Sequence, residues 1–326
     1  MDDNMRDEGP LRPGGDAPAV ERAQVRTHAA VNDRLKAVGL MCVALILFSA
    51  LDTSAKHLAT STGLPIVQIV WVRFAGQFLL MLSFLSALPL STLFATQKPG
   101  WELVRSALMA STTACNFLAL QYLRLDQTVT VVFLAPLVVA LLAGPLLGEW
   151  VGWRRLVAIL VGFLGILIVV RPGLGGLHHA FIYAFGAMLA YALFMLLTRY
   201  LAAYDKPLAM LFYSILLGTF GLAPFALWQW VWPETIGQWL LLPLLGILGG
   251  TGHYLFIHAY RLAPASTVAP FLYMQLLSMV AFGYAVFGDV PDLWTIAGAA
   301  VIIASGIYLI HRERVTRTPI EPVEPI

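Results

Sequence analysis

The stretch AVGLMCVALILFSALDTSAKHL, residues 37–58, decides the fold class of this chain. A helix needs about 20 mostly apolar residues to cross a bilayer, and this run is long enough while its only acidic or basic residues, besides one histidine, are Asp52 and Lys56. The composition agrees, because 59% of the 326 residues are hydrophobic and 12% are charged. Soluble domains are about 45–50% apolar and about 25% charged. We therefore predict an all-α membrane protein with the lipid bilayer as its surroundings.

Nine further apolar runs follow, and we expect each of them to form a transmembrane helix. The ten expected spans are residues 37–58, 66–85, 101–120, 128–147, 151–170, 180–201, 208–230, 239–260, 268–287 and 293–310. Residues 1–36 contain Asp, Glu, Arg, Pro and Gly without an apolar stretch, which predicts a disordered polar tail. Residues 312–326 form a second polar tail.

The distribution of Lys and Arg predicts the orientation of these spans. With the N-terminus placed in the cytoplasm, sixteen basic residues fall in cytoplasmic segments and only Arg124 and Arg171 fall outside. Cytoplasmic loops of membrane proteins carry such an excess of basic residues. We therefore expect a multi-pass protein of the bacterial inner (plasma) membrane with both termini in the cytoplasm.

The two halves of the chain show a weak internal repeat. A shift of 140 residues places Ala119 on Ala259, Gly148 on Gly288 and Glu149 on Asp289. We expect one repeat in residues 37–171 and another in residues 177–311. Each repeat holds an odd number of spans, so the second copy enters the membrane upside down. Two inverted five-helix repeats that flank a site near the midplane are a common transporter architecture.

Four stretches carry a resemblance to a known family. They are FLALQYLRLDQTVTVVFLAPLVVALLAGPLLGEW (117–150), GFLGILIVVRPG (162–173), HAYRLAPASTVAPFLY (258–273) and FGDVPDLWTIAGAAVIIASGIYL (287–309). They resemble the EamA-like branch of the drug/metabolite transporter (DMT) superfamily, except that Asp289 stands where the family usually has Glu. The resemblance implies a ten-helix carrier of metabolites such as amino acids, vitamins or nucleotide-like compounds. It does not identify the substrate.

Three ionisable residues, Asp52, Lys56 and Arg73, lie within the expected spans. Such residues are costly in a membrane and are functional candidates by default. Asp52 and Lys56 are four residues apart and can pair on one helix face, although Lys56 can also reach the interface. With a rise of 1.5 Å per residue, Asp52 and Arg73 lie at similar depths of about 10 and about 13 Å. An Asp52–Arg73 ion pair with a structural or a substrate-binding role is therefore predicted, and the alternative is an unpaired Asp52 that carries a proton during transport.

Neutral polar residues inside the spans are the remaining candidates for lining an aqueous cavity. Asn116 follows Thr112 and Thr113 by one turn, and Thr251, Tyr254 and His258 form a stripe along one helix. Tyr191 and Gln275 lie in two other spans. Each residue could line a cavity or bond a neighbouring helix.

Glycines cluster nearby in the span that carries the Tyr254 stripe. They are Gly246, Gly249, Gly250 and Gly252. Small residues allow two helices to approach closely. The cluster therefore predicts a tightly packed helix, which is either static or able to slide.

These features together favour a secondary-active transporter that works by alternating access. The chain lacks the Gly-x-x-x-x-Gly-Lys-Ser/Thr loop of nucleotide-driven pumps and any His-Glu-x-x-His or Cys-x-x-Cys pattern. We expect no cofactor, no metal, no catalytic residue and no nucleic acid partner. The substrate is expected to be a small organic molecule such as an amino acid, riboflavin or a nucleotide-like solute, and a homodimer is left open. The alternative is an integral-membrane enzyme that acts on a lipid-like substrate, but the catalytic carboxylates or histidines that it would need at one interface are not found.

Overall fold

The computed structural model describes residues 19–85, 94–147, 153–170, 178–201, 204–262, 271–272 and 274–316. Every regular element within these ranges is helical, which confirms the predicted all-α class. The elements are α1 (Ala19–Ser61), α2 (Ile66–Leu85), α3 (Pro99–Leu120), α4 (Leu125–Val132), α5 (Ala135–Leu147), α6 (Trp153–Val170), α7 (Phe181–Leu201), α8 (Pro207–Leu216), the π-helix η2 (Leu217–Gly221), α9 (Ala223–Trp228), α10 (Ile236–Leu262), α12 (Met274–Phe282), the π-helix η4 (Gly283–Phe287) and α13 (Leu293–Thr316).

Six helical stretches of the described chain are long and apolar enough to cross a membrane. They are Asp33–Ser61, Ile66–Ser83, Pro99–Leu120, Phe181–Thr198, Ala209–Trp228 and Ile236–Ala259. The other four expected spans coincide with shorter apolar helical stretches, Leu125–Val139, Leu156–Val169, Met274–Phe287 and Leu293–Tyr308. The structure thus supports a multi-pass membrane protein, whereas the number of ten crossings stays a prediction.

Two expected spans are not continuous helices, which corrects the sequence prediction. The run 128–147 is divided between α4 and α5 by a turn at Phe133 and Leu134, and Pro136 is the second residue of α5. Proline lacks a backbone N–H and is tolerated in the first turn of a helix but not in its interior, which favours a new helix start here. The run 208–230 is likewise divided into α8, η2 and α9, and Pro224 stands at the start of α9.

The polar tail also differs from its prediction, because α1 begins at Ala19 rather than near residue 37. The segment AVERAQVRTHAAVNDRLK contains four Ala and three Arg, together with Glu, Gln, Leu and Lys, and has neither Gly nor Pro. These residue types have high helix propensity, so the membrane helix extends into the polar segment. Residues 1–18 and 317–326, which complete the two predicted tails, lie outside the described ranges.

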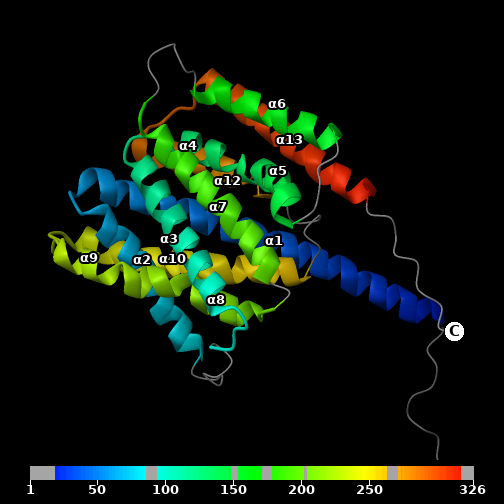
Figure 1. Ribbon diagram of the computed structural model, residues 1–326, viewed down its shortest axis with the longest axis horizontal. Helices are drawn as coiled ribbons and strands as arrows, with labels where there is room; N and C mark the ends of the chain where they lie inside the picture. The colour runs from blue at the N-terminus through cyan, green and yellow to red at the C-terminus, as the bar shows by residue number, and fades with distance from the viewer. Residues whose placement is uncertain are drawn as a thin grey trace, which may run out of the picture.

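The helices pack in a small number of close pairs. The most extensive contacts join α1 with α10, α3 with α7 and α6 with α13, and the α6–α13 pair is seen side by side in Figure 1. Helix α2 crosses α10 at Gly76 and Gly246, where a Cβ added to Gly246 would lie 2.5 Å from the Cα of Gly76. The glycine cluster of α10 is therefore a close helix contact, as predicted. This crossing fixes α2, and with it Arg73, against α10.

Candidate functional site

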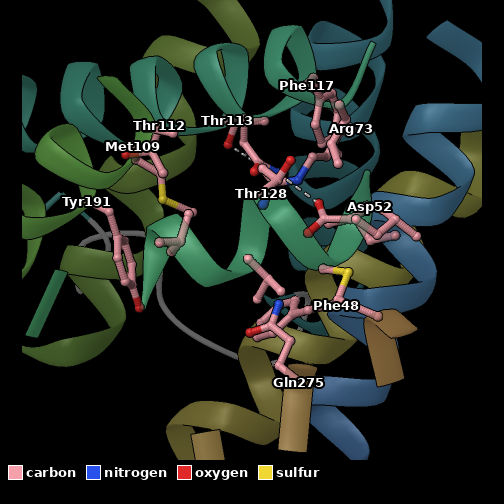
Figure 2. A pocket seen from close by; sticks show the side chains of 18 of the residues that line it. Phe48, Asp52, Arg73, Met109, Thr112, Thr113, Phe117, Thr128, Tyr191 and Gln275 are labelled. Carbon is pink, nitrogen blue, oxygen red and sulfur yellow. Dashed lines mark hydrogen bonds between the residues drawn. The ribbon is translucent and has the colours of Figure 1, made fainter. Parts of the chain in front are cut away.

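A cavity of about 170 Å³ lies among helices α1, α2, α3, α4, α7, α10 and α12 (Figure 2). Its wall combines aromatic, sulfur-containing and aliphatic side chains with two charged residues, Asp52 and Arg73. Five of the seven residues predicted to line a cavity do so: Asp52, Arg73, Asn116, Tyr191 and Gln275. In Figure 2, Tyr191 lies at the left of the cavity, across from Asp52 and Arg73 at the right.

Arg73 enters the cavity from the middle of α2 and is 4% exposed. Its Nη1 donates a hydrogen bond of 2.8 Å to Oγ1 of Thr113 on α3, and its guanidinium lies 4.8 Å from the ring centre of Phe74. Within the described chain, its buried Nε has no hydrogen-bond partner. A guanidinium carries five N–H donors, so most of the bonding capacity of Arg73 is unused.

Asp52 faces Arg73 from α1, but the two side chains form no direct ion pair within the described chain. The Oδ1 of Asp52 instead accepts a hydrogen bond of 3.1 Å from Nδ2 of Asn116 on α3. Both side chains line the same cavity. The predicted pair is therefore corrected: the matched depths bring both residues to one cavity, and each is held by a neutral partner on α3.

Lys56 does not pair with Asp52, which corrects the second predicted contact. Its Nζ lies 3.2 Å from Oδ2 of Asp289 and donates a hydrogen bond of 3.2 Å to the backbone oxygen of Leu123. The ammonium also lies 4.7 Å from the ring centre of Phe287. Lys56 lies near the C-terminal end of α1. Its long side chain extends to Leu123 and Asp289 beside that end, instead of turning back by one helical turn to Asp52. Lys56 is not among the residues that line the cavity.

The predicted stripe on α10 does not face the cavity. Tyr254 is 57% exposed, and its ring contacts that of His258 at a centroid distance of 4.5 Å. His253 lines the cavity instead, with its ring centre 4.9 Å from that of Phe48 and its buried Nε2 without a partner in the described chain.

The sequence contained a signal for His253. It follows Gly249 by one helical turn and Gly246 by two, and residues three and four apart share a helix face. These glycines lie on the face of α10 that packs against α2. Residues on the same face, including His253, therefore point toward the interior of the protein.

A second buried arginine lies away from the cavity. Arg105 of α3 forms an ion pair with Glu102, with Nη2 2.8 Å and Nε 2.9 Å from Oε2. The two side chains are 3% and 0% exposed. Arg105 also donates to the backbone oxygen of Met210 on α8. This arrangement fastens α3 to α8 and leaves little of the guanidinium available.

The lining of the cavity combines charged, polar and apolar side chains. Charged and polar groups at Asp52, Arg73, Asn116, Tyr191 and Gln275 lie among apolar groups such as Met109 and Phe117. Ligand sites typically combine an apolar lining with a few placed polar groups. Among the described residues, no group of three or more His, Cys, Asp or Glu is arranged to hold a metal ion.

Comparisons with known proteins agree with this description. The chain is 31% identical over 276 residues to a riboflavin transporter of Vibrio cholerae, covering 84% of this chain and 92% of the relative. It is 26% identical over 288 residues to an S-adenosylmethionine uptake transporter of Rickettsia bellii, covering 87% and 98% of the two chains. It is also 28% identical over 290 residues to a pseudopaline exporter of Pseudomonas aeruginosa, covering 86% and 98%.

Structural similarity extends the agreement to the fold. A solved crystal structure that is 18% identical superposes with a TM-score of 0.57 and covers 86% of this chain and 98% of its own. The sequence pattern of the EamA-like transporter family matches twice, at residues 35–171 and at residues 179–312. Together these matches cover most of the chain, which therefore belongs to the EamA-like transporter family.

Proposed function

We propose that this protein is a secondary-active transporter that moves a small organic metabolite across the bacterial inner membrane by alternating access. The observation that carries the proposal is the cavity that holds Asp52 and Arg73 among apolar helices. Charged groups inside a membrane are costly and persist where they serve a solute or an ion path. The proposed binding residues are Asp52, Arg73, Asn116, Tyr191 and Gln275, with His253 added from the structure.

The architecture proposed for this function is ten spans in two inverted repeats. The family pattern matches each half of the chain separately, and the helix packing supports the same division. If the two halves are exchanged, α1 corresponds to α7 and α10 to α3, so the close α1–α10 pair becomes the close α7–α3 pair. Helices α6 and α13 correspond to each other, so the exchange maps their close pair onto itself. Such an internal two-fold relation is expected of inverted repeats around a shared site.

The substrate is proposed to be an amino acid, a vitamin such as riboflavin or a nucleotide-like solute. Relatives named for riboflavin, S-adenosylmethionine and pseudopaline favour a small metabolite over an ion. Since those names include both uptake and export, they leave the direction of transport open.

Transport should be measured with the purified full chain in proteoliposomes that contain no nucleotide. We expect counterflow of radiolabelled riboflavin, S-adenosylmethionine or an amino acid from a panel, because no nucleotide-binding loop is present. Liposomes without protein supply the background. A strict requirement for internal ATP would contradict the proposal.

The topology should be tested with reporter fusions in cells. Fusions after Arg171 and after Arg314 are expected to report opposite sides of the membrane, with the C-terminal fusion in the cytoplasm. Two reporters on the same side would rule out the ten-span arrangement.

A further inference from the structure

We infer that the cavity binds a small zwitterion, a solute that carries an ammonium and a carboxylate close together, with the carboxylate on Arg73 and the ammonium on Asp52. The inference rests on the proposed transport function and specifies its substrate class. It depends on the unused bonding capacity of the two charged residues, their spacing, the charge balance of the cavity and its size.

The first argument is the bonding capacity. In the described chain, Arg73 donates one hydrogen bond, to Thr113, and leaves its Nε unpaired. Asp52 accepts one hydrogen bond, on Oδ1 from Asn116. An ionised carboxylate has about four acceptor sites. Both residues can therefore bind a ligand group of opposite charge without giving up a present bond.

The second argument is the spacing, which α3 sets. The partners of the two charges, Thr113 and Asn116, stand three residues apart on that helix. Side chains at this interval have Cβ atoms about 5–6 Å apart. Charge-assisted hydrogen bonds have lengths of about 2.7–2.9 Å, so a molecule with its ammonium and carboxylate on one carbon can reach both Asp52 and Arg73.

The third argument is the charge balance. One negative and one positive side chain line the cavity, together with the imidazole of His253. A solute with a single net charge would neutralise one residue and leave the other without its counter-charge in a buried site, which is costly. A zwitterion gives each residue an opposite charge and leaves the balance unchanged.

The fourth argument is the size. The cavity volume of about 170 Å³ lies below the range of about 300–1,000 Å³ that is usual for pockets of drug-sized ligands. An α-amino acid fits such a space better than a flavin does. The apolar part of its side chain would lie against Phe48 and Met109, which share the cavity with the two charges.

Binding to the purified full chain in detergent should be measured with matched ligands. The twenty protein amino acids and S-adenosylmethionine are screened by equilibrium titration, and the tightest ligand is then compared with its decarboxylated and deaminated analogues. For L-leucine these are 3-methylbutylamine and 4-methylpentanoate. Each analogue is expected to bind at least about tenfold more weakly, because hydrogen bonds to charged groups contribute about 1.5–3 kcal/mol.

Two isosteric variants assign the ligand groups to their partners. In Arg73→Gln the advantage of the amino acid over the amine should disappear, while its advantage over the acid remains. In Asp52→Asn the advantage of the amino acid over the acid should disappear, while its advantage over the amine remains. Arg124→Gln is the matched control, because Arg124 pairs with Asp126 and does not line the cavity. The wild-type comparison of analogues stands even if one variant fails to fold.

The outcomes separate this inference from the transport function. Equal binding of the amino acid and either analogue would overturn the inference, as would a screen in which no zwitterion binds. Transport of riboflavin with unchanged affinity in both variants would also overturn it, while the transport function would stand. Zwitterion binding without transport of any solute would leave the inference standing and remove the transport function.

Discussion

The two buried arginines of this protein, Arg73 and Arg105, are partnered in opposite ways. Arg105 has an ion pair with Glu102 and a hydrogen bond to a backbone oxygen of α8. Arg73 has one hydrogen bond to a neutral hydroxyl, and its acidic neighbour Asp52 is held by Asn116. Both side chains are shielded from solvent. Burial alone therefore does not distinguish a structural charge from one that is available to a ligand.

The difference in partners suggests a difference in role. The Glu102–Arg105 pair joins α3 to α8 and does not line the cavity at Asp52, so the pair serves the packing of the fold. Arg73 and Asp52 line a cavity and keep unused donors and acceptors. A buried charge without full compensation costs free energy, and in our proposal the substrate supplies the missing partner.

The largest expected effect comes from removing the counter-charge of Arg105. Glu102→Gln should lower the stability of the folded protein by about 3–5 kcal/mol, because it leaves an uncompensated buried guanidinium. Yield of monodisperse protein and apparent melting temperature in detergent measure the change. Asp52→Asn is the matched comparison and should lower the melting temperature less. A smaller loss in Glu102→Gln than in Asp52→Asn would reverse the assignment of structural and available charges.

The second prediction concerns the helix crossing that positions Arg73 and not Arg105. Gly246→Ala places a methyl group 2.5 Å from the Cα of Gly76, which should cost about 1–3 kcal/mol by overpacking and displace α2. We expect a lower melting temperature and a loss of ligand binding. Gly100→Ala is the control, since a Cβ there meets nothing within 4 Å. If the two variants behave alike, the crossing does not position the site.

The third prediction compares the two charge pairs directly by double-mutant cycles. Coupling between Glu102 and Arg105 in the variants Glu102→Gln and Arg105→Gln should be about 2–3 kcal/mol, because the charges are in contact. Coupling between Asp52 and Arg73 should be about 1 kcal/mol or less, since the two residues line one cavity without a direct ion pair. Melting temperatures of all single and double variants, measured without ligand, provide the test. Equal couplings would show that Asp52 and Arg73 are a second structural pair.

Much of the fold could be predicted from the sequence, because membrane helices follow from length and apolar composition alone. Each expected span overlaps an apolar helical stretch. The breaks at Phe133 and Leu222 were not predicted, although Pro136 and Pro224 follow them within three residues. Hydropathy is averaged along a run, and it does not register where a backbone hydrogen bond is missing.

The candidate site could be predicted in its members but not in its contacts. The similar depths expected for Asp52 and Arg73 predicted that they lie close together, and both line the cavity. Their actual partners, Thr113 and Asn116, depend on how α3 is rotated, which sequence spacing does not fix. On α10, the polar pattern predicted that the face with Tyr254 lines the cavity. The structure shows that Tyr254 is exposed and that His253, on the glycine face, lines the cavity. On a helix beside another helix, the small residues marked the interior more reliably than the polar ones did.

The smallest expected effect comes from the hydroxyl that holds Arg73. Thr113→Val keeps the shape of the side chain and removes the acceptor of the 2.8 Å bond from Nη1, which should cost about 1 kcal/mol of stability. Thr198→Val is the control, because Thr198 accepts only a long hydrogen bond of 3.4 Å from Arg105, and the ion pair of Arg105 with Glu102 remains.

The Thr113→Val and Thr198→Val variants should differ more in ligand binding than in stability. Without Thr113 the guanidinium is less restrained, so the affinity for the amino acid should fall by about three- to tenfold, whereas Thr198→Val should leave it unchanged. An unchanged affinity in Thr113→Val would mean that α3 does not set the position of Arg73, and the spacing argument for a zwitterion would lose its basis.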